Sequence, residues 1–124
     1  MCQKAVGNVF AALAPVREQD LLWTRGTPAS FRSSSVADRL FCPACGTPLA
    51  FCYIGSQWIG LTIGSFDQPS VIVPVIHYGV ESRLPWLCAV MTGLPEEATE
   101  ATVDSPVMRP DFINLQHPDH DTDR

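Results

Sequence analysis

The chain has 124 residues, of which 46% are hydrophobic and 17% are charged, and its formal net charge is −5. This composition is typical of one globular domain and excludes a disordered chain. The eight Lys and Arg residues form no basic run, and no stretch approaches the length of a membrane-spanning helix, so neither nucleic acid nor a membrane is an expected partner.

Short β-prone runs, separated by prolines and glycines, predict an all-β domain of short antiparallel strands. Residues 1–5 predict one helical turn and show no secretory pattern, so we expect a cytoplasmic protein. The predicted strands, in chain order, are 9–16, 21–24, 39–42, 49–54, 58–63 and 71–78, and residues 30–35 predict a short polar strand or a loop. The runs 49–54 and 58–63 predict a hairpin. Residues 1–100 are the expected domain, and residues 101–124 are an expected flexible polar tail.

Cys42 and Cys45 form a Cys-x-x-Cys pair between two predicted strands. This spacing lets two thiolates reach one metal ion from a tight turn, and zinc in a structural site takes four ligands. Gly46 follows at a point where such turns favour a left-handed residue. We therefore predict that Cys42 and Cys45 hold a zinc ion at a hairpin tip.

Two other interpretations of the pair exist. A redox pair would need a helix that begins at the second cysteine within a βαβ pattern. Gly46 and Pro48 oppose such a helix, and a predicted strand follows them. The other alternative, two ordinary buried thiols, stays open.

Two cysteines do not complete a zinc site. The remaining candidate ligands are Cys2, Cys52, Cys88, His77, His117 and His120. The apolar surroundings of Cys52 and Cys88 favour core thiols, and the position of His77 in a predicted strand favours a structural histidine. His117 and His120 lie in the polar tail, so we expect their side chains to be solvated and not to bind metal. An odd number of cysteines without a secretory segment argues against a disulfide framework.

Several segments, taken in order, resemble the glutathione-dependent formaldehyde-activating enzymes, the GFA or CENP-V/GFA family, whose members have a β-tent fold. The matching segments are CQKAVG from Cys2, LWTRG from Leu22, FRSS from Phe31, FCPACGTPL from Phe41, GSFD from Gly64 and LPW from Leu84. The resemblance implies a β-tent-like zinc-knuckle domain. It also implies a carbon–sulfur lyase that acts on the glutathione–formaldehyde adduct or a similar small thiol adduct.

The resemblance further assigns individual cysteines. Cys42 and Cys45 match half of the family's structural zinc site, and Cys2 matches the last cysteine of a separate catalytic zinc cluster. The other family cysteines would precede Met1, so we expect an N-terminally incomplete chain with Cys2 as the remnant of that cluster. The alternative is a non-catalytic, metal-stabilised structural or binding domain. Sheet edges left without partners would favour a homo-oligomer.

Overall fold

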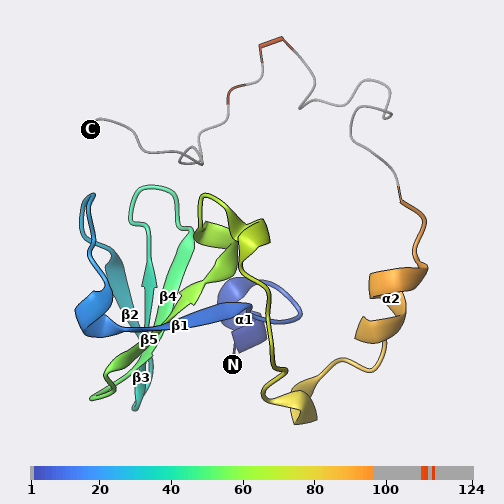
Figure 1. Cartoon of the computed structure of the whole chain (residues 1–124), viewed down its shortest axis with the longest axis horizontal. Coiled ribbons are helices and arrows are strands. Elements are labelled where there is room, and N and C mark those ends of the chain that lie inside the picture. The colour runs from blue at the N-terminus through green and yellow to red at the C-terminus, as the bar shows by residue number, and fades with distance from the viewer. Residues whose placement is uncertain (1, 97–109, 112, 114–124) are drawn as a thin grey trace.

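A computed structural model describes residues 2–96, 110, 111 and 113. Five strands form one antiparallel sheet in the order β1-β5-β4-β3-β2 (Figure 1). The strands are β1 (Leu13–Arg17), β2 (Ala29–Ser34), β3 (Ala37–Phe41), β4 (Pro48–Tyr53) and β5 (Trp58–Thr62). The prediction of an all-β domain with short antiparallel strands is therefore confirmed.

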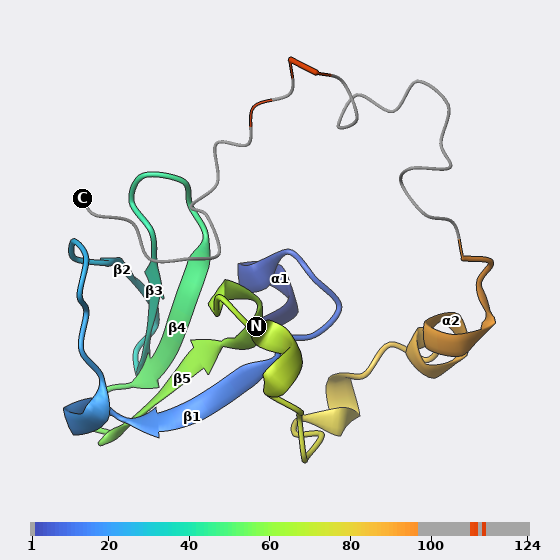
Figure 2. The ribbon, with the colours of Figure 1, turned by 45° about the horizontal axis from the view of Figure 1, so that its top comes forward.

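Helix α1 (Cys2–Val6) confirms the predicted N-terminal turn, and the later helix α2 (Leu87–Gly93) stands apart from the sheet in both views (Figures 1 and 2). Short 3-10 turns fill the connections: η1 (Glu18–Asp20), η2 (Ile63–Ser65), η3 (Pro69–Val71) and η4 (Val80–Ser82). None of the helices in the described residues has the length and apolar character of a membrane-spanning segment. The predicted tail, 101–124, lies outside the described residues except for 110, 111 and 113.

Two predicted strands are wrong. Residues 21–24 form no strand, because they belong to the connection that must carry the chain from β1 to β2 at the opposite edge of the sheet. Residues 71–78 begin in η3 and continue without a strand partner. Pro69 and Pro74 each lack the backbone N–H that a ladder requires. The apolar side chains of this segment are consequently exposed, and Val75 is 94% exposed.

The strand register divides the side chains between two faces. Phe31, Arg39 and Phe51 lie opposite one another on β2, β3 and β4. Because successive side chains alternate, Arg32 and Asp38 lie on the other face. They form a cross-strand ion pair with Arg32 Nε 2.5 Å from Asp38 Oδ1. We call the first side, on which Phe31, Arg39 and Phe51 lie, the aromatic face.

The described core is small. Its buried apolar residues are Ala37, Ala50, Ile59 and Ile63. The predicted hairpin is confirmed, since Ala50 pairs with Leu61 and Cys52 pairs with Ile59 in adjacent strands. A sheet with so little buried apolar area has little stability to spare, so the connections and any bound ligand matter to folding.

Candidate functional site

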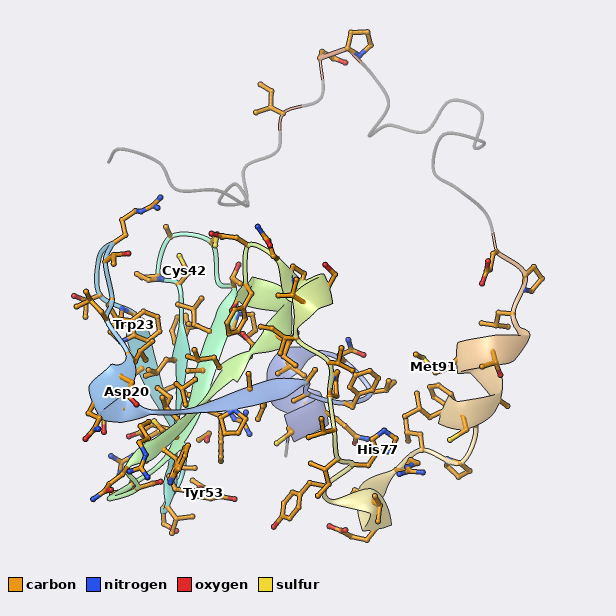
Figure 3. The ribbon with its side chains drawn as sticks, viewed as in Figure 1. Asp20, Trp23, Cys42, Tyr53, His77 and Met91 are labelled. Carbon is orange, nitrogen blue, oxygen red and sulfur yellow. The ribbon has the colours of Figure 1, made fainter. Side chains whose placement is uncertain are left out.

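The predicted cysteine pair lies in the connection between β3 and β4, which we call the cysteine turn (residues 42–47). Figure 3 shows Cys42 at one end of the sheet and Tyr53, the last residue of β4, at the other. The Cys42 N–H donates to the Thr47 carbonyl at 2.9 Å, and the Gly46 N–H donates to the Cys42 carbonyl at 2.8 Å. These hydrogen bonds close the turn, so both cysteines belong to one short, tied loop.

Gly46 has the backbone conformation that the turn requires. Its φ is +78°, in the left-handed region that disfavours residues with a Cβ. The sequence-based expectation for this position is confirmed. The glycine therefore lets the chain reverse directly after Cys45 and enter β4 at Pro48.

The cysteine turn also favours the ionised form of one thiol. The Cys45 Sγ lies 3.1 Å from the Thr47 Oγ1. The Thr47 hydroxyl, the Thr47 backbone and the Cys42 side chain, in that order of importance, lower the pKa of Cys45 against a small opposing effect of burial. A lower pKa raises the thiolate fraction, and the thiolate is the form that binds metal.

Cys42 and Cys45 carry thiols, a donor type that zinc binds in structural sites, which take four ligands. Within the described residues, no group of three or more His, Cys, Asp and Glu side chains gathers in a way that could hold a metal ion. Neither Cys2 nor Cys52 therefore joins Cys42 and Cys45 in such a group. His117 and His120 lie outside the described residues.

The remaining candidate ligands lie elsewhere. His77 is exposed and far from Cys42 in Figure 3, and its Nδ1 lies 3.1 Å from Arg83 Nη2. It is not the strand histidine that we predicted, because its segment forms no strand. Cys88 is exposed in α2, so its prediction as a core thiol is also wrong.

Cys52 is half-buried on β4, and its Sγ donates to the Asp38 carbonyl at 3.8 Å. Burial raises the pKa of Cys52 most, and the charges of Asp38 and Glu18 raise it further. A raised pKa keeps this thiol neutral and disfavours metal binding. Cys52 therefore has the properties of an interior thiol.

Cys2 lies on α1, close to the aromatic face. Its Sγ accepts a hydrogen bond from Arg39 Nη2 at 3.5 Å, across 37 positions of sequence. The Arg39 Cζ in turn lies 5.0 Å from the centroid of the Phe51 ring, within range of a cation–π interaction. The structure thus places Cys2 beside a fixed positive charge.

A cavity of about 360 Å³ adjoins this contact, between α1 and the sheet. Its lining is mainly apolar and includes Ala5, Val6, Leu13, Phe31, Arg39 and Phe51. Gly46 of the cysteine turn borders the same cavity. The cavity therefore connects the surroundings of Arg39 with the cysteine turn.

The sequence interpretation did not single out Arg39 or Thr47. Thr47 follows Cys45 by two residues, a spacing at which a hydroxyl reaches back within a tight turn, so a local signal existed. Arg39 had no comparable signal in the sequence, because its aromatic neighbours Phe31 and Phe51 lie on the adjacent strands. Their proximity to Arg39 follows only from the register of β2, β3 and β4.

Comparison with protein-family models matches residues 1–82 of the 124 to the family described as glutathione-dependent formaldehyde-activating enzyme. No curated protein and no solved structure matched the chain.

Proposed function

The chain belongs to the glutathione-dependent formaldehyde-activating enzyme family, and from this membership we propose that it is a zinc-binding protein with carbon–sulfur lyase activity on small thiol adducts. The single observation that carries zinc binding is the closed cysteine turn, which presents Cys42 and Cys45 from one loop. The lowered pKa of Cys45 adds to it. Zinc bound there would hold β3 and β4 together and would stabilise the fold.

Each part of the chain has a separate role in this proposal. Cys42 and Cys45 supply two structural zinc ligands. Cys2, by its match to the family's catalytic cluster, marks the position of the chemistry, beside Arg39. The substrate class follows from the family and is the glutathione–formaldehyde adduct or a similar hemithioacetal, whose carbon–sulfur bond is made or broken.

A second candidate function is a metal-stabilised structural or binding domain without catalysis. The observation that favours it is that, among the described residues, neither Cys2 nor the cysteine turn belongs to a group of three or more potential metal ligands. Both candidates need zinc at Cys42 and Cys45, and only the first needs turnover.

The test combines zinc content with turnover. The purified chain is expected to hold about one zinc ion when Cys42 and Cys45 are intact, and Cys42→Ser and Cys45→Ser should lose it. Cys88→Ser is the matched control, since it removes an exposed thiol outside the cysteine turn. Turnover of S-hydroxymethylglutathione is measured on the same samples. Zinc without turnover favours the second candidate, and absence of zinc from the parent protein contradicts both.

A further inference from the structure

Arg39 is a half-buried cation in an apolar cavity. Within the described part of the chain its polar contact is the Cys2 Sγ, and no carboxylate pairs with it. A guanidinium presents five N–H donors, so one sulfur acceptor leaves most of them without a protein partner. Cations that are partly withdrawn from water are often paired, because desolvation of an unpaired charge is unfavourable. The surroundings of Arg39 therefore suit an anion that the described residues do not supply.

Arg39 has contacts on two sides. Its Cζ lies 5.0 Å from the centroid of the Phe51 ring, and its Nη2 donates a hydrogen bond to the Cys2 Sγ. A planar guanidinium can bind a carboxylate through two parallel hydrogen bonds. The sheet thus places the guanidinium of Arg39 at the wall of the cavity, where it can pair with the carboxylate of a ligand.

The rest of the cavity selects a compact, apolar ligand body. Its volume of about 360 Å³ is near the lower end of the roughly 300–1,000 Å³ that is typical of small-molecule pockets. Val6, Leu13 and Phe51 contribute apolar surface. Phe31 also lines it and is 63% exposed, so the cavity is accessible from solvent.

We propose that this cavity binds a small carboxylate with an apolar body, and that Arg39 pairs with the carboxylate. The carboxylate site itself is argued from the cavity and Arg39. Only the identity of its natural ligand, a thiol adduct that carries a carboxylate, rests on the proposed function. Arg39 is then a specificity-determining residue, because it selects an acid over a neutral molecule of the same shape.

The test uses three probes on the full chain: 4-phenylbutyrate, 4-phenylbutanol and inorganic phosphate. Binding is followed by amide chemical-shift changes in NMR spectra. The butyrate should bind about ten- to a hundredfold more tightly than the alcohol, because a hydrogen bond between the charged carboxylate and Arg39 contributes that much to the affinity. It should perturb the amides of Phe51 and Gly46, which border the cavity. Phosphate, which lacks the apolar body, should bind more weakly than the butyrate.

Two arginine variants complete the test. Arg39→Gln should abolish the preference for the acid over the alcohol, and Arg39→Lys should restore part of it. Arg32→Gln is the matched control, because Arg32 follows Phe31 on β2 of the same sheet but lies on the opposite face, paired with Asp38. It should leave the preference unchanged.

Several results would overturn the proposal: equal affinity of the parent protein for acid and alcohol, phosphate binding as tight as butyrate binding, or an Arg39→Gln variant that keeps the preference. If Arg39→Gln does not fold, the comparison of probes on the parent protein decides alone. None of these measurements uses zinc or turnover. A protein that binds the acid but neither holds zinc nor turns over the adduct would contradict the proposed function and leave the carboxylate site standing.

Discussion

Replacement of Gly46 by Ala should destabilise the protein through backbone conformation alone. Gly46 has a φ of +78°, and a Cβ added there would meet no heavy atom within 4 Å. Steric overlap with neighbouring side chains therefore contributes nothing to the expected loss of stability. A left-handed backbone costs a residue with a Cβ about 1–2 kcal/mol, which corresponds to a roughly 5- to 30-fold increase in the unfolding equilibrium constant.

Gly64 provides the matched control. A Cβ at Gly64 would also meet no heavy atom within 4 Å, and its φ is not in the left-handed region. Gly64→Ala should therefore leave the free energy of unfolding within about 1 kcal/mol of the parent or raise it, since alanine restricts the unfolded chain. Urea unfolding of the three proteins, in chelator to exclude metal effects, measures the difference. The m-value should stay constant, so that the midpoints report stability.

The urea midpoints of the two variants test whether the cysteine turn needs a left-handed residue at position 46. If Gly46→Ala unfolds at the same urea concentration as Gly64→Ala, or at a higher one, the cysteine turn does not need a left-handed residue. The reasoning that links this glycine to closure of the turn would then fail. With zinc added, the same variant should also show weaker metal retention than the parent, because the closed turn presents both thiols.

The remaining predictions concern the thiols, the core and the metal. Thr47→Val should raise the pKa of Cys45 toward its ordinary value, because the hydroxyl that lowers it is removed; iodoacetamide alkylation of the metal-free protein at neutral pH should slow, whereas Thr47→Ser should not slow it. In the parent, Cys45 should alkylate before Cys52, whose pKa is raised by burial; the reverse order would contradict the assignment. Ile59→Ala, at a side chain only 5% exposed, should cost about 2–5 kcal/mol by urea unfolding, whereas Val75→Ala should stay within about 0.5 kcal/mol. Chelation of zinc should lower the urea midpoint of the parent, and a midpoint that is independent of zinc would argue against a structural metal.

Strand positions were predictable wherever hydrophobic alternation coincided with a short-range partner. Residues 49–54 and 58–63 lie on either side of a three-residue turn and pair with each other as β4 and β5. The segment 71–78 has the same apolar character but no partner strand. Its β propensity predicted a strand because propensity measures how a side chain suits a pleated surface, and it does not supply the neighbouring strand.

Some residues of the candidate site were predictable from the sequence, and others were not. Cys42, Cys45 and Cys2 were identifiable from motif spacing and family resemblance, and their roles as metal ligands stay predictions that the zinc measurements test. Arg39 was not identifiable, because its importance depends on Phe51, one strand away, and on Cys2, 37 positions earlier.

The sequence by itself determined the local features of this protein: the cysteine pair, the left-handed glycine after it and the β-prone runs. These depend on residues a few positions apart, whose conformations are limited by backbone sterics and by hydrogen bonds within one turn. Only the tertiary structure decided which thiols stay separate, which arginine faces the aromatic side chains and where a cavity remains. Those features depend on strand register and on the docking of α1, and register is a property of pairs of strands, so no single segment specifies it.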